Sequence, residues 1–96
     1  MPQPHALAEH RERIDELDAE LIKTLAKRFA ITRQVGELKA RLNLPAQDST
    51  REASQFERIE KLAEELGLGS KVARAVLRLV VDLVLAEHAE TSATSS

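Results

Sequence analysis

Two cations lie in the apolar stripe of a predicted helix, and their spacing suits a small dianion. On a helical wheel, Arg28 and Lys39 fall on the same face as Leu21, Leu25 and Val35. A single cation there is explained by a long side chain that covers apolar surface while its head reaches water. Two on one stripe favour an anion site, because unpaired buried cations are costly. Their Cα atoms would lie about 16 Å apart along the axis, so both heads can reach inward to one ligand.

A third basic residue, Arg11, borders the same face about 25 Å further along the helix. It cannot reach a ligand held between Arg28 and Lys39 of its own chain, whereas an antiparallel partner helix would bring it there. On spacing alone, the simpler interpretation is a solvated side chain beside Glu12 and Asp15.

The motif Asp48-x-x-Arg51-Glu52 puts two carboxylates and a guanidinium on the first turn of a second predicted helix. Ser49 to Glu52 also matches the S-x-x-E capping box, in which both side chains satisfy free N–H groups of the helix. That structural role accounts for Ser49 and Glu52 without any ligand. The functional alternative uses the carboxylates as acceptors for a substrate hydroxyl.

The composition argues against several other kinds of site. The chain has no cysteine, and its three histidines lack a helical ligand spacing, so we expect no metal site. No Ser-His-Asp pattern, phosphate loop or dinucleotide-binding motif is present. A net charge of −2 and an aromatic content of 2% argue against a nucleic-acid binder. His88 shares a face with Leu77, Val81 and Val84, which is typical of a partly buried, hydrogen-bonded residue.

Three helices must position these residues, and we expect an all-α fold in a single domain of 96 residues. The predicted elements are a long, a short and a medium helix, with disordered tails at residues 1–5 and 91–96. The long helix runs from Ala6 to about Arg41 and the short helix from Ser49 to Gly67. The medium helix runs from Ser70, as its N-cap, to about His88. The long helix, at roughly 50 Å, is too long to be covered by its own chain. Two chains pairing through their long helices would bury both stripes, so we expect a homodimer.

No segment of the sequence reads as a membrane span or a signal peptide. The longest apolar run, residues 75–86, is interrupted by Arg78 and Asp82, and a bilayer span needs roughly 20 apolar residues. The N-terminal residues lack a basic region followed by an apolar run. We therefore expect a cytoplasmic protein that binds neither membrane nor nucleic acid.

The motifs also form one combined pattern that runs from about Leu7 to His88. Its pieces are Arg11-x-x-Ile14-Asp15-x-x-Asp18, Lys27-Arg28, Val35-Gly36-x-x-Lys39, Leu44-Pro45-x-x-Asp48-x-x-Arg51-Glu52 and Gly67-Leu68. With the order of the three helices, this combination resembles the all-α chorismate mutases. The resemblance implies an intertwined homodimer with two active sites. Its implied activity is the cofactor-independent Claisen rearrangement of chorismate to prephenate in phenylalanine and tyrosine biosynthesis.

The resemblance also implies a role for each matching cation. Arg28 and Arg11 of the partner subunit would clamp the two substrate carboxylates, a task that suits the planar guanidinium. Lys39 would hydrogen-bond the ether oxygen and a carboxylate, and so stabilise the negative charge that grows as the C–O bond breaks.

The remaining matched residues would bind the ring hydroxyl and form the walls of the site. Asp48, through its backbone, and Glu52 would fix the hydroxyl, while Arg51 would help to bind a substrate carboxylate. The apolar walls would come from Val35, Val81 and Leu85.

Two positions depart from the family pattern. His88 stands where many members carry glutamine as a second donor to the ether oxygen, so we expect kcat/KM to rise as the pH falls through the titration of His88. If the register slips by one residue, Glu87 takes this position. Val84 stands where the family often has a small polar residue near a substrate carboxylate. Without that polar contact, we expect KM to be raised more than kcat is lowered.

Three alternatives compete with this interpretation. Two are sister activities on the same fold, isochorismate–pyruvate lyase and aminodeoxychorismate mutase; the turn at Asp48-x-x-Arg51-Glu52 looks more like the mutases. The third is a non-catalytic helical dimerisation or regulatory module that has lost activity through the changes at Val84 and His88. The cations within an apolar stripe argue against that module, which has no need of them.

Overall fold

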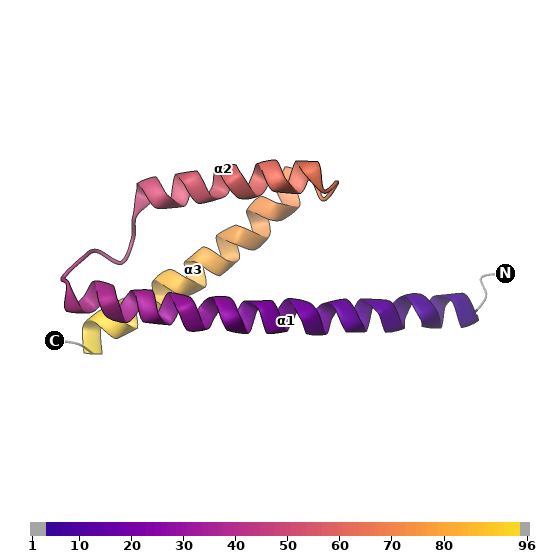
Figure 1. The fold of residues 1–96 in the computed structure, drawn as a ribbon, viewed down its shortest axis with the longest axis horizontal. Helices are drawn as coiled ribbons and strands as arrows, with labels where there is room; N and C mark the ends of the chain where they lie inside the picture. The colour runs from indigo at the N-terminus through magenta and orange to yellow at the C-terminus, as the bar shows by residue number, and fades with distance from the viewer. Residues whose placement is uncertain (1–3, 95–96) are drawn as a thin grey trace. The chain divides into compact units, whose positions relative to one another are not determined.

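The computed structural model describes residues 4–94, with side chains described for residues 4–91. It contains three helices, α1 (Pro4–Arg41), α2 (Ser49–Glu65) and α3 (Ser70–Thr94) (Figure 1). These described residues include no strand, and none of their helices is both long and apolar enough to cross a membrane. The predicted all-α order of a long, a short and a medium helix is therefore confirmed.

The chain divides into two units, residues 1–31 and residues 32–96. The described part of the first unit is a single helix, the N-terminal portion of α1, and it carries Arg11 and Arg28. The second unit holds the last ten residues of α1 together with α2 and α3. Most of the residues predicted to form a site therefore lie within the second unit.

Within the second unit, α2 and α3 pack through small and β-branched side chains. After the α2–α3 turn, α3 runs back toward the C-terminal end of α1 (Figure 1). The buried apolar residues are Ala63 of α2 and Ala73, Leu77, Val80 and Val81 of α3. Alanine at the crossing lets the two backbones approach closely, and the valine-rich segment is helical because its buried residues recur at helical spacing.

Both α1 and α2 end in the same hydrogen-bonded motif, which turns the chain sharply. After α1, Asn43 adopts a φ of 55° and the Leu44 N–H donates to the Lys39 carbonyl at 2.9 Å. After α2, Gly67 adopts a φ of 74° and the Leu68 N–H donates to the Ala63 carbonyl at 2.9 Å. These are Schellman caps, and they need a residue that tolerates a left-handed backbone, as glycine and asparagine do.

The ends of α1 and α3 differ from the prediction. α3 continues to Thr94, beyond the predicted end at His88 and into the segment predicted as a polar tail. No glycine or proline follows Gly69 to stop the helix, and the Thr91 hydroxyl donates to the Glu87 carbonyl at 3.0 Å. α1 begins at Pro4, inside the predicted N-terminal tail, while residues 1–3, 95 and 96 lie outside the described residues.

The start of α3 also differs from the prediction, which made Ser70 the N-cap. Ser70 is instead the first residue of the helix, and its backbone N–H donates to the Glu64 carboxylate at 3.0 Å. A carboxylate from the end of α2 therefore satisfies one of the free N–H groups of α3, as expected for an anion at a helix N-terminus.

The start of α2 shows that the predicted capping box is wrong. Asp48 is the N-cap, with an extended backbone and a carboxylate that accepts from the Arg51 N–H at 3.0 Å. Ser49 is already the first helical residue, and the Glu52 carboxylate binds other partners. Asp48 is the better cap here because its carboxylate, three residues before Arg51, reaches the free N–H directly.

We expect Asp48→Ala to lower the free energy of unfolding by about 1 kcal/mol, because it removes the acceptor of the helix cap. Ser49→Ala is the matched control and should change stability by less than about 0.5 kcal/mol, since Ser49 lies inside the helix. Urea denaturation followed by circular dichroism measures both. A larger loss for Ser49→Ala than for Asp48→Ala would restore the capping box.

Candidate active site

A cavity of about 80 Å³ lies within the second unit and draws side chains from every helix of that unit. Its walls come from the end of α1, the α1–α2 loop, the first two turns of α2 and the middle of α3. The lining residues are Lys39, Ala46, Asp48, Arg51, Glu52, Gln55, Val81 and Leu85. Six of these eight were predicted as site residues from the sequence, namely Lys39, Asp48, Arg51, Glu52, Val81 and Leu85.

Lys39 is tied to the α1–α2 loop by two hydrogen bonds. Its Nζ donates to the Ala46 carbonyl at 3.0 Å, and its own carbonyl accepts from the Leu44 N–H. The half-buried ammonium group has three hydrogens, so two remain for a ligand in the cavity. The loop therefore fixes the position of the cation without using up its capacity to donate.

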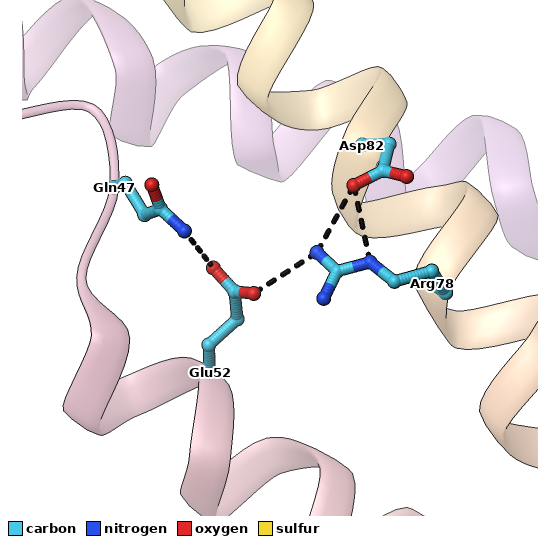
Figure 2. A network of polar contacts seen from close by, with 4 residues as sticks. All are labelled: Gln47, Glu52, Arg78 and Asp82. Carbon is cyan, nitrogen blue, oxygen red and sulfur yellow. Dashed lines mark hydrogen bonds and ion pairs between the residues drawn. The ribbon is translucent and has the colours of Figure 1, made fainter.

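Glu52 presents a largely buried carboxylate in which each oxygen has one partner. Its side chain is 15% exposed. One oxygen accepts from Arg78 Nη2 at 2.9 Å and the other from Gln47 Nε2 at 3.2 Å (Figure 2). Since each carboxylate oxygen can accept two hydrogen bonds, Glu52 can still accept from a ligand hydroxyl.

The charges lining the cavity are arranged so that its cations stay free. The Asp48 carboxylate caps α2, and the Glu52 carboxylate pairs with Arg78. Among residues 4–91, Lys39 and Arg51 form no ion pair. Two unpaired cations beside an apolar wall favour the binding of an anion that also has an apolar face.

His88 lies beside this cavity and contacts the end of α1. It is 6% exposed, and its Nε2 lies 2.7 Å from the Thr32 carbonyl, so Nε2 carries the hydrogen and donates. A Cβ on Gly36 would come within 2.5 Å of the imidazole Cδ2, so the ring packs closely only because position 36 is glycine. His88 and Lys39 line a smaller neighbouring cavity together with Gly36, Ala40, Leu44 and Ala46.

The two nitrogens of His88 therefore differ in what they can do. Nε2–H is committed to Thr32, while Nδ1 is buried and has no hydrogen-bond partner among the described residues. In the neutral ring Nδ1 only accepts, and it becomes a donor when the ring is protonated. The role of His88 as a second donor stays a prediction, but this geometry restricts it to the imidazolium.

The remaining predicted residues do not line this cavity. Val84 is half-buried on α3, and Val35 is exposed on α1. Arg11 and Arg28 belong to the first unit. Arg28 Nη1 is buried and has no hydrogen-bond partner in the described part of the chain. A buried donor without a partner is consistent with a role in binding an anion. The assignment of all four to the site stays a prediction.

Sequence reasoning missed Ala46, Gln47, Gln55 and Arg78. Gln55 follows Asp48 and Glu52 at spacings of seven and three, so helical periodicity alone would have placed it on the same face. In the sequence, Arg78 stands out only as one of the two charged residues that interrupt the apolar run of residues 75–86. Its contact with Glu52, 26 residues away, depends on how α3 packs against α2.

The described residues were also searched for clusters of side chains that could bind a metal ion. No group of three or more histidine or carboxylate side chains there is placed to hold an ion. The polar side-chain groups that line the cavity are one ammonium, one guanidinium, two carboxylates and one amide.

Comparison with known proteins gives one consistent family. The family model for chorismate mutase type II matches residues 10–89. A chorismate mutase of Methanocaldococcus jannaschii is 32% identical over 79% of this chain and 77% of its own length. A T-protein of Enterobacter agglomerans is 41% identical over 74% of this chain. A bifunctional chorismate mutase/prephenate dehydratase of Aquifex aeolicus is 31% identical over 83% of it.

The two longer relatives are matched over only part of their length. The chain spans 19% of the T-protein and 22% of the bifunctional protein, so it corresponds to one segment of each. The M. jannaschii protein, in contrast, is matched over most of its length. With the family model covering residues 10–89, this chain belongs to the chorismate mutase type II family.

Proposed function

We propose that this chain is a chorismate mutase, which rearranges chorismate to prephenate. The observation that carries the proposal is the cavity in which Lys39 and Arg51 are free of ion pairs beside the Glu52 carboxylate, in a member of the chorismate mutase type II family. The reaction is unimolecular: the ether C–O bond breaks while a C–C bond forms. It needs no nucleophile or redox group, so catalysis comes from holding the reactive conformer and stabilising the developing charge.

Lys39 is the group that stabilises the ether oxygen in this proposal. Negative charge grows on that oxygen in the transition state, and an ammonium hydrogen bond strengthens as it does. Because the Ala46 carbonyl already holds Nζ, little reorganisation is needed when the charge develops. Arg51 binds a substrate carboxylate, for which a guanidinium offers paired donors.

Glu52 and Asp48 orient the ring through its hydroxyl. The free lone pairs of the Glu52 carboxylate accept the hydroxyl hydrogen, and Asp48 contributes through its backbone at the start of α2. Val81 and Leu85 form the apolar wall against which the ring lies. These contacts favour a compact conformer in which the two bond-forming carbons approach each other.

We also propose that the active molecule is a homodimer in which Arg11 of the partner subunit completes each site, together with Arg28. The support is the N-terminal portion of α1, where Leu7, Ile14, Leu17 and Leu21 recur at helical spacing and are about half exposed. A second α1 would cover this stripe. The buried, unpartnered Nη1 of Arg28 supports its role as a carboxylate ligand.

The direct test is the disappearance of chorismate, followed by its ultraviolet absorbance, with acid conversion of the product to phenylpyruvate identifying prephenate. We expect Lys39→Ala to lower kcat/KM by at least about 100-fold, because a preorganised donor to the developing charge is lost. The exposed Lys61→Ala on α2 is the matched control and should retain activity.

Two outcomes would contradict the proposed activity. A folded wild-type protein that leaves chorismate unchanged would overturn it, and isochorismate would then be tested as the substrate of the sister lyase. Full activity of Lys39→Ala would show that the cavity around Lys39 is not the site of the reaction.

Mixing two inactive variants tests the shared site. If Arg11 acts across the interface, a mixed dimer of Arg11→Ala and Lys39→Ala chains has one intact site of its two. After exchange of subunits, about a quarter of the wild-type activity should return, since half of the dimers are mixed and each has one site. No recovery, with exchange verified by mass, would mean that Arg11 serves its own chain or none.

The pH profile tests the role of His88. Since Nε2–H is held by Thr32, the ring donates a second hydrogen bond from Nδ1 only when protonated. We expect kcat/KM of the wild type to rise as the pH falls from about 8 to 5. Lys39 is the charged residue that lines the smaller cavity together with His88. Its charge acts on the imidazole, so the measurement uses chains in which Lys39 is unchanged.

His88→Gln is the control for that profile, because an amide donates at every pH in this range. It should give a profile without the histidine-dependent rise. Identical profiles for the wild type and His88→Gln would exclude the imidazolium as a donor.

A further inference from the structure

Arg78 on α3 is a charged residue that the proposed mechanism leaves unused, yet it contacts Glu52 directly. Its side chain is 46% exposed, and it does not line the cavity. We propose that Arg78 is a positioning residue: its guanidinium holds the Glu52 carboxylate for the substrate hydroxyl and keeps that carboxylate from pairing with Lys39 and Arg51. This inference rests on the proposed function.

The guanidinium of Arg78 is held between two carboxylates (Figure 2). Its Nη2 donates to Glu52 at 2.9 Å, while Nε and Nη2 lie 3.1 and 3.0 Å from one oxygen of Asp82. Asp82 lies one helical turn beyond Arg78 on α3, so it fixes the guanidinium to its own helix. Because Glu52 lies on α2, this contact lets a residue of α3 hold the side chain of a residue that lines the cavity.

An aromatic ring completes the support of this guanidinium. The Cζ of Arg78 lies 5.1 Å from the centre of the Phe56 ring, which α2 places one turn beyond Glu52. The hydrogen bond to Glu52 raises the pKa of Arg78, with Asp82 adding to the effect, against some opposing desolvation. The Arg78 guanidinium therefore has three partners, namely the Glu52 and Asp82 carboxylates and the Phe56 ring.

The consequence concerns the partners available to Glu52. A largely buried carboxylate needs a counter-charge, because a buried charge without one is costly. Arg78 supplies that charge from outside the cavity, and the side chain of Gln47 binds the second oxygen. Without Arg78, the cations that share the cavity with Glu52 are Lys39 and Arg51. If either of them formed an ion pair with Glu52, it would no longer be free to bind the substrate.

A second arginine provides a matched comparison on the same pair of helices. Arg74, one turn before Arg78 on α3, pairs with Glu60 of α2, and its Nε donates to that carboxylate at 2.7 Å. Neither Arg74 nor Glu60 lines the cavity. If the α3–α2 ion pairs only stabilise packing, losing either arginine should have the same effect on the protein.

The experiment compares Arg78→Gln with Arg74→Gln by steady-state kinetics on chorismate and by thermal unfolding. We expect Arg78→Gln to lower kcat/KM by about 10-fold or more, the effect of one charge-assisted hydrogen bond, while Arg74→Gln stays within about twofold of wild type. Both should lower the melting temperature to a similar, small extent. Arg78→Lys keeps the charge and should recover part of the loss, and it serves as the folded alternative if Arg78→Gln is unstable.

A double-mutant cycle separates positioning from packing. In a Glu52→Gln background the carboxylate is already gone, so Arg78→Gln should lower kcat/KM by no more than about twofold further. Additive losses in the double variant would mean that Arg78 acts on something other than Glu52, and this would overturn the proposal.

The remaining outcomes distinguish this inference from the proposed function. A wild-type protein without chorismate turnover would overturn the function and the inference together. An active wild type in which Arg78→Gln and Arg74→Gln behave alike would leave the function standing and overturn the positioning role alone.

Discussion

The central constraint on this cavity is electrostatic: two of the cations that line it, Lys39 and Arg51, have no carboxylate partner among residues 4–91. Both stay unpaired because the acidic residues beside them are already engaged. Asp48 caps the helix that begins beside it, and Glu52 faces a guanidinium from another helix. In the proposed function, the carboxylates of an anionic ligand supply the counter-charge that these two cations lack.

The ends of helices, rather than their middles, hold the polar groups of the site. α1 ends in a Schellman cap that uses the Lys39 carbonyl, so the same residue fixes the turn and supplies the ammonium group. The loop then returns to Lys39 through the Ala46 carbonyl and leads into the N-cap at Asp48. The backbone hydrogen bonds that end one helix and begin the next therefore also set the positions of the cation and the carboxylates.

α3 contributes to this arrangement in two different ways. Its apolar face supplies Val81 and Leu85 as a wall, and a neighbouring face supplies the guanidinium that faces Glu52. Further along the same helix, His88 packs so closely against Gly36 that any residue with a Cβ at position 36 would clash with the imidazole. A helix whose exposed residues look like ordinary surface charges is thus a support for groups on both other helices of this unit.

Local sequence patterns were enough to predict the three helices, their approximate limits and six of the eight residues that line the cavity. Helical periodicity, the end of the long helix before Asn43-Leu44-Pro45 and the turn at Gly67 are local signals. They can be recognised in the sequence without knowledge of the fold. The position of Lys39 in an apolar stripe and the motif from Asp48 to Glu52 likewise predicted residues that the structure brings together. The capping box at Ser49 was wrong because two acceptors competed for one helix start, and the pattern alone did not rank them.

Which charged residues form ion pairs and which do not depends on how the helices pack, and this could not be predicted from the sequence. The sequence shows Arg78 and Asp82 as neighbours on one helix, but the third member, Glu52, comes from α2 through the packing of the two helices. The close approach of His88 to Gly36 and Thr32 spans more than 50 residues and has the same origin. Such partners are fixed by distances of a few ångströms between helices, and a one-dimensional pattern carries no information about those distances.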